Sequence, residues 1–258
     1  MNGLAKRAAP FFITIVRLAL GISLMGMAGM ASANKPDNIT DAEMKVLPRY
    51  CPDTMGFNYG DAYTNTSPRA GHWVALMGKG FWNMHHYCWA QINLLRAQRN
   101  GVSRQFKQGI LGGVRSDYQY VLSRSPADFI MRPEVLTRLG EVELMLANPN
   151  AANIAFSSAR ELKPDYWPAY SHWAEYLIRA GKKAEAKQLL QTGLEYAPNA
   201  KVLVEQYRMV GGKPSDIVPK AKAPEQETDI PAPVSTPVEK KETAKDTPET
   251  KPATKTAE

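Results

Sequence analysis

Two adjacent segments of 34 residues decide the fold: residues 133–166 read PEVLTRLGEVELMLANPNAANIAFSSARELKPDY, and residues 167–200 read WPAYSHWAEYLIRAGKKAEAKQLLQTGLEYAPNA. Pro164 and Pro198 lie at the same place in the two segments, where proline stops a helix. Asn148-Pro149-Asn150 and Gly181 are typical of turns inside each segment. Each segment therefore predicts two short antiparallel helices. Small and bulky residues recur at the same offsets: Leu139-Gly140 with Trp173-Ala174, Ala152 with Ala186, Phe156 with Leu190, and Ala159 with Gly193.

The 34-residue period, the small residues and the closing proline resemble the tetratricopeptide repeat family. The resemblance implies an all-α solenoid of short antiparallel helix hairpins, with the small residues where two helix backbones approach most closely. It also implies a groove lined by the first helix of each repeat, but by itself it indicates almost nothing about function. The groove residues that it indicates in this chain are Glu134, Thr137, Glu141, Ser171, Glu175 and Arg179.

This predicted groove differs from the carboxylate clamp of the family. Its six residues are of mixed charge with an acidic excess, and they lack the basic and amide residues of that clamp. A partner with a basic or polar segment is therefore expected, rather than a C-terminal carboxylate. His172 is expected on an outer helix position without a role.

Two repeats are too few to bury a continuous core, so we expect further helices beside them. Upstream, residues 82–99 and 102–123 predict a longer helix hairpin that turns at Asn100-Gly101. Downstream, residues 201–210 predict one more amphipathic helix, where a solenoid carries its capping helix. Residues 81–212 are thus expected to form the helical repeats, and residues 34–80 an irregular segment packed on the first helices.

The two ends of the chain differ from the middle. Residues 1–33 are typical of a secretory signal peptide, because a basic start precedes an apolar run and the small residues Ala31-Ser32-Ala33. We expect cleavage near Ala33 and a periplasmic or secreted protein. The alternative is an uncleaved anchor, which would make the chain a membrane-anchored assembly factor. Residues 213–258 hold many Pro, Lys, Glu and Thr residues and no aromatic residue, which predicts a disordered tail.

The net charge argues against nucleic-acid binding. The whole chain is +7, but residues 1–33 hold three bases and no acid, and residues 213–258 hold 8 bases and 9 acids. The middle keeps 21 bases and 16 acids, which is only +5 over 179 residues. Such a mild excess is no signature of a nucleic-acid surface.

Cys51 and Cys88 are the two cysteines of the chain, and two interpretations compete for them. In an oxidising compartment they are expected to form a disulfide, which would hold the irregular segment against an aromatic helix. His85 would then be a core histidine that bonds to a backbone carbonyl. The alternative is a metal or haem site in an envelope protein, because Cys and His at i, i+3 can share one ion. Its candidate ligands are Cys51, Cys88, His72, His85, His86 and Met84.

Catalytic motifs are not found in the sequence: there is no Gly-x-Ser-x-Gly, no His-Glu-x-x-His, no phosphate loop and no dinucleotide fingerprint. We therefore expect no enzyme and no cofactor. The sequence predicts a periplasmic adaptor or scaffold that binds a protein partner of the cell envelope.

Overall fold

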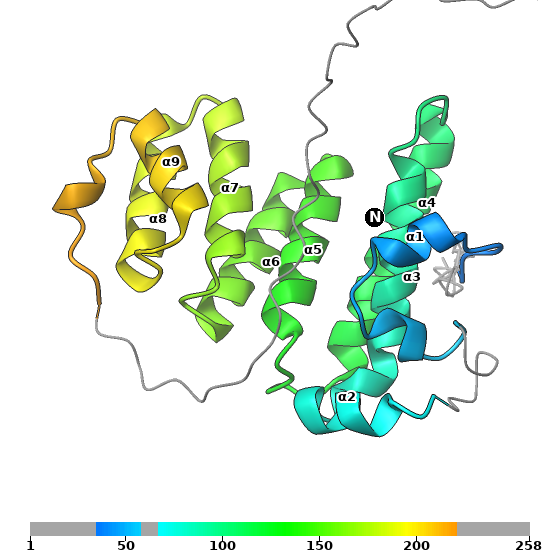
Figure 1. Cartoon of the computed structure of the whole chain (residues 1–258). Helices are drawn as coiled ribbons and strands as arrows, with labels where there is room; N and C mark the ends of the chain where they lie inside the picture. The colour runs from blue at the N-terminus through cyan, green and yellow to red at the C-terminus, as the bar shows by residue number, and fades with distance from the viewer. Residues whose placement is uncertain (1–34, 58–66, 221–258) are drawn as a thin grey trace, which may run out of the picture. The chain divides into compact units, whose positions relative to one another are not determined.

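The computed structural model describes residues 35–57 and 67–220, and in this part the protein is all-α, with nine α-helices (Figure 1). The predicted signal peptide and most of the predicted tail lie outside the described residues. The seven longer helices are α3 (Met84–Ala97), α4 (Arg104–Arg124), α5 (Arg132–Met145), α6 (Pro149–Leu162), α7 (Trp167–Arg179), α8 (Lys183–Tyr196) and α9 (Lys201–Met209). The shorter elements are α1 (Asp41–Lys45), α2 (Ala70–Met77) and the 3₁₀ turns η1 (Cys51–Asp53), η2 (Lys79–Asn83) and η3 (Pro214–Asp216).

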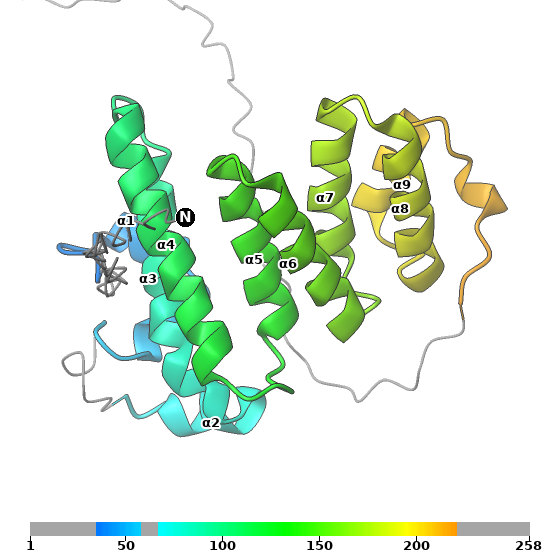
Figure 2. The same cartoon turned by 180° about the vertical axis from the view of Figure 1, so that it is seen from behind.

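The long helices pack in sequential pairs, as the sequence predicts. α3 packs on α4, α5 on α6 and α7 on α8, and each pair contacts the next (Figures 1 and 2). α9 packs on both α7 and α8. The first helices of neighbouring pairs also touch, α5 with α7 and α7 with α9. The helix pairs therefore lie side by side in the same order as in the sequence.

Small residues lie where these helices meet most closely, which confirms the predicted register. A Cβ atom added to Gly140 in α5 would lie 2.7 Å from the Phe156 ring of α6. A Cβ atom added to Gly193 in α8 would lie 2.9 Å from both Leu203 and Tyr170. Ala152, Ala174 and Ala186 are fully buried. A larger side chain at any of these positions would force helices or rings apart.

Helices α5, α7 and α9 end in the same way. The residue after each C-cap has a positive φ: 61° at Ala147, 77° at Gly181 and 76° at Gly211. The next N–H donates to the carbonyl five residues back, for example Asn148 to Glu143 at 2.8 Å and Lys182 to Leu177 at 2.9 Å. This is the Schellman motif, for which glycine is the preferred residue. Ala147 adopts the conformation although it carries a Cβ atom.

The segment before α3 is more ordered than the sequence predicted. Helix α1 begins with a capping box, in which the Thr40 side chain accepts from the Glu43 N–H and the Glu43 side chain accepts from the Thr40 N–H. Glu43 is buried and also accepts from Arg96 Nε at 2.7 Å and Arg99 Nη2 at 2.6 Å. Arg96 lowers the pKa of Glu43 to about 2. These bonds fasten α1 to the end of α3.

The predicted tail boundary also needs correction, since residues 213–220 are placed by the structure. The Lys220 N–H donates to the Glu195 carbonyl at 2.7 Å, and its Nζ lies 2.8 Å from Glu195 Oε2. These contacts return the chain to the end of α8. No helix of the described residues has the length and apolar character needed to cross a bilayer.

Candidate partner-binding face

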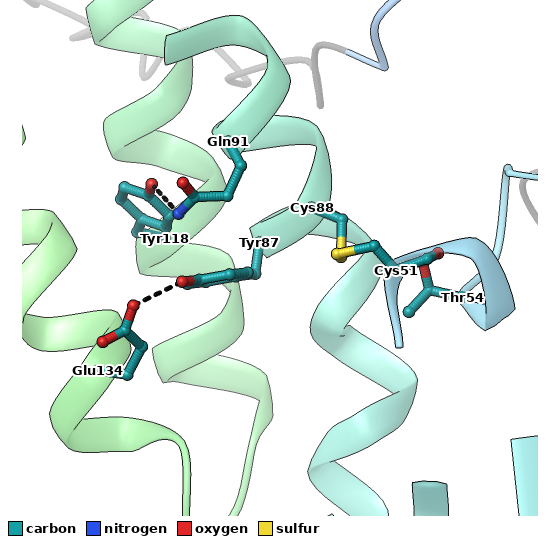
Figure 3. Close-up of a disulfide and its surroundings, with 7 residues drawn as sticks. All are labelled: Cys51, Thr54, Tyr87, Cys88, Gln91, Tyr118 and Glu134. Atoms are coloured by element: carbon teal, nitrogen blue, oxygen red, sulfur yellow. Dashed lines mark hydrogen bonds between the residues drawn. A yellow bond between two sulfur atoms is a disulfide. The ribbon is translucent and has the colours of Figure 1, made fainter. Parts of the chain in front are cut away.

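Cys51 and Cys88 are joined by a disulfide with an Sγ–Sγ distance of 2.00 Å, as one of the two interpretations of the sequence expects (Figure 3). It ties η1 to the middle of α3, and both cysteines are fully buried. The Thr54 hydroxyl donates to the Cys51 carbonyl at 2.8 Å and steadies the turn on the η1 side. The bond closes a separation of 37 residues. A buried bond of this kind is structural rather than a site of exchange.

The disulfide removes the sulfur ligands from the alternative metal site, because neither cysteine is a thiolate while the bond is intact. His72 lies exposed on α2, edge-on to Trp73. Met84 is fully buried in the core. In the described parts of the chain, no three His, Cys, Asp or Glu side chains are grouped so that they could hold a metal ion.

His85 is a core histidine, as expected. Its Nδ1 donates to the Trp82 carbonyl at 2.9 Å, and the ring packs edge-on to Trp89. Burial, followed by the nearby His86, lowers the pKa of His85 to about 4, while the backbone bond opposes the shift. The imidazole is therefore neutral at physiological pH.

His86 has a buried partner that the sequence did not indicate. Its Nδ1 lies 2.8 Å from Asp117 Oδ1 of α4, and its ring stacks on Tyr120 at 3.7 Å between centroids. Burial raises the pKa of Asp117, and the bond to His86 opposes that change. The two residues are 31 apart in sequence, so no local pattern predicts the pair.

Glu134 of α5 is the centre of a buried polar network. It accepts from Tyr87 Oη of α3 at 2.6 Å, from Arg138 Nε at 2.8 Å and from the Tyr166 hydroxyl (Figure 3 draws the bond to Tyr87). Burial favours a raised pKa for Glu134, but the charge of Arg138 and the two tyrosine hydroxyls outweigh it and hold the pKa below its ordinary value. The carboxylate is thus ionised inside the protein.

The network continues from Arg138 towards α7. Arg138 Nη1 donates to Glu141 Oε2 at 3.1 Å, and Glu141 Oε1 lies 3.1 Å from His172 Nδ1. A continuous chain of polar contacts therefore joins α3, α5 and α7, the first helices of three successive pairs. Its members, called the inner network below, are Tyr87, Glu134, Arg138, Glu141, Tyr166 and His172.

The inner network corrects the expectation for His172, which lies between α5 and α7 rather than on an outer position without a role. Its side chain is 34% exposed, that of Arg138 is 28% exposed and that of Glu141 is 16% exposed. These three side chains can therefore be reached from solvent in part. Glu134 cannot, because it is buried beneath Arg138 and the two tyrosines.

The six predicted groove residues do not form one exposed surface. Thr137 is buried and donates to the Pro133 carbonyl of its own helix at 2.8 Å. Ser171 is also buried, and its carbonyl accepts from Gln206 of α9 at 3.4 Å. Glu175 and Arg179 are exposed and pair with each other at 2.8 Å. The helical period places the six residues on one side of each helix, but the neighbouring helices cover part of that side.

A hollow of about 520 Å³ lies on α6, α7 and α8, and the sequence analysis missed it. Trp173 and Tyr176 stack within it, with ring centroids 4.9 Å apart. Asn150 and Asn153 of α6 and Gln188 of α8 supply amide groups to its wall. Aromatic faces beside amides can hold extended polypeptide.

Comparison with known proteins assigns the protein to no family, so its class is defined by its fold alone. No protein-family model matches the chain, and no curated protein matches it significantly. The structure itself defines an all-helical protein whose helices pack in sequential pairs, with a disulfide between the N-terminal segment and the first long helix.

Proposed function

We propose that the protein is a non-catalytic adaptor of the tetratricopeptide type that binds a protein partner in the cell envelope. The 34-residue period supports this assignment, as do the small residues at helix crossings and the common ending of α5 and α7. A repeat fold of this kind presents an extended surface made by successive helices. No catalytic or cofactor role is included in the proposal.

The inner network is the observation that carries the proposed binding face. Ion pairs inside a protein are costly to build, and their bonds hold each side chain in one orientation. Here they order a face across three helices and leave Arg138, Glu141 and His172 partly exposed at its edge. Such fixed side chains lose little conformational freedom on binding, which favours recognition of a partner.

The charges of this face support a partner with a basic or polar segment. Arg138 is neutralised by Glu134 and Glu141, so it is not free to hold a terminal carboxylate. Glu175 adds an exposed carboxylate on α7, which pairs with Arg179 of the same helix. An incoming Lys or Arg can compete for Glu175 at little cost, because exposed pairs contribute about 0–1 kcal/mol.

A periplasmic or otherwise exported location is part of the same proposal. The disulfide is consistent with an oxidising compartment, where such bonds persist. Residues 1–33, which carry the expected signal peptide, lie outside the described residues. The mass of the protein isolated from the cell envelope tests this point, and the expected value corresponds to cleavage near Ala33 with no free thiol.

Photo-crosslinking in cells tests the binding face. A photo-reactive residue placed at Glu175 should crosslink to one partner, and the same residue at Glu161, an exposed position on α6, is the matched control. In a second strain the photo-reactive residue replaces Arg179, and the same chain also carries Glu175→Lys. This strain should no longer crosslink to the partner. Equal crosslinking from the Glu161 position, or a partner that is kept by Glu175→Lys, would contradict the proposed face.

A further inference from the structure

The tip of the α3–α4 hairpin extends beyond the neighbouring pair. α4 has 21 residues, whereas α5 and α6 have 14 each. At 1.5 Å per residue the extra length is about 10 Å. In Figure 1 the hairpin reaches past the ends of α5 and α6. The side chains of this tip therefore project from the molecule.

The tip carries exposed apolar side chains. The Phe106 side chain, in the first turn of α4, is 65% exposed, and Leu95 of α3 is 37% exposed. Nothing lies within 4 Å of the position where Gly109, one turn further along, would carry a Cβ atom. Phe106 and Gly109 line a hollow together with Asn93 of α3 and Ile110 of α4. A large exposed aromatic ring on a projecting helix end is unfavourable in water and calls for a partner.

The tip is also basic. Residues 94–116 contain five Lys or Arg residues and no Asp or Glu. Three of them have carboxylate partners: Arg96 and Arg99 at Glu43, and Arg115 at 4.0 Å from Glu143. Arg104 and Lys107 have no carboxylate within 4.0 Å among the described residues. Two cations without a carboxylate partner thus flank Phe106.

The positions of Arg104 and Lys107 oppose the stability of α4. A helix N-terminus carries partial positive charge and favours acidic residues, yet the first turn of α4 holds no acid. Ser103 caps the helix, since its hydroxyl accepts from the Phe106 N–H at 3.3 Å. Arg104 and Lys107 place positive charge where the helix dipole disfavours it. A local rule that is broken without compensation is expected at functional positions.

We propose that this tip docks on an anionic lipid surface, with Arg104 and Lys107 at the phosphate groups and Phe106 inserted among them. Bases that surround an aromatic or aliphatic residue are the composition of interfacial membrane segments. The patch projects, so a planar surface reaches it without steric conflict. The docked protein would stay at the membrane while the inner network remains open to a partner, and neither proposal depends on the other.

Vesicle sedimentation tests the inference with the protein as it is isolated from the cell envelope. The vesicles contain either phosphatidylcholine alone or phosphatidylcholine mixed with anionic phosphatidylglycerol. Partition should be at least about tenfold stronger with the anionic vesicles and should fall with salt. Because each base near such a surface contributes about fivefold, Arg104→Gln with Lys107→Gln should weaken it about thirty-fold. Phe106→Ala should weaken it several-fold.

The matched control is Lys183→Gln with Lys201→Gln, two exposed bases on α8 and α9 that change the net charge equally. This control should keep wild-type partition within about twofold. The variant with Arg104→Gln and Lys107→Gln should unfold at or above the wild-type temperature, since it relieves repulsion at the helix start. Equal loss in control and tip variants would overturn the inference. So would unchanged binding by either tip variant, or equal partition into phosphatidylcholine vesicles with and without phosphatidylglycerol.

Discussion

Acidification should destabilise the protein through His85 in a defined pH window. The pKa of His85 is about 4 in the folded protein and 6.5 as the ordinary value. Between these values the unfolded chain binds a proton that the folded chain does not, so stability falls as pH falls. The loss is absent above about pH 6.5, grows as the pH falls from 6.5 to about 4, and is complete below about 4.

The expected loss follows from these two pKa values. Lowering the pH from 7 to 5 protonates His85 in nearly all unfolded chains and in about a tenth of the folded ones. Linkage then gives a loss of about 2 kcal/mol in the free energy of unfolding, as an order of magnitude. Asp117 has the opposite effect on stability. Its raised pKa means that the folded chain binds a proton more tightly than the unfolded chain, so its contribution to stability increases as pH falls. Glu43, with a pKa of about 2, contributes a loss mainly below pH 4.5.

Urea unfolding of the wild type and His85→Asn at pH 7 and pH 5 isolates this contribution. Asparagine keeps a donor for the Trp82 carbonyl but does not titrate, and its packing defect is the same at both pH values. The variant should therefore lose about 2 kcal/mol less than the wild type between the two pH values. His72→Asn, at an exposed position, is the control and should retain the wild-type loss. Equal losses in wild type and His85→Asn would refute a buried neutral imidazole.

Three further predictions concern the turns, the helix crossings and the disulfide. Ala147 has a φ of 61°, so Ala147→Gly should stabilise the protein by about 1 kcal/mol, and Gly181→Ala at the equivalent turn should destabilise it by a similar amount. A lower midpoint of thermal unfolding for Ala147→Gly, or a higher one for Gly181→Ala, would exclude the Schellman ending. Ala186→Leu should destabilise by about 1–3 kcal/mol, because Ala186 is fully buried in α8, and an unchanged unfolding midpoint would remove it from a helix crossing. Reduction of the Cys51–Cys88 bond should lower stability by about 3–4 kcal/mol, as expected for a loop of 37 residues, and added Cu²⁺ or Zn²⁺ should not restore it; recovery with metal would favour the metal site.

The helix pairs were predictable from the sequence because their signals are local and periodic. Gly140, Gly193 and Pro164 recur at fixed offsets in a 34-residue period, so spacing alone indicates where helices cross and end. The short helix α1 also had a local signal, the Thr40-x-x-Glu43 capping box, which the sequence analysis did not use.

The inner network was not predictable in the same way. Glu134 meets Tyr87 and Tyr166, which are 47 and 32 residues away, and a helical period does not identify partners on other helices. Of the six predicted groove residues, Glu141 lies against α7, where its Oε1 is 3.1 Å from His172 Nδ1. The period could not show that α9 covers Ser171, since the exposure of a helix face depends on what packs against it.

Both ends of the row of helix pairs are covered, and this limits where a partner can bind. At the N-terminal end the disulfide, the Glu43–Arg96 pair and the contact of Gly56 with the Trp89 ring hold residues 35–57 on α3. At the other end α9 buries Leu203 and Tyr207 against α7 and α8. A further helix pair could extend the row only by displacing one of these covers. The covalent bond makes that displacement costly at the first end, because breaking it forfeits about 3–4 kcal/mol. Binding is thus expected across the row, at the inner network, rather than by addition of helices at its ends.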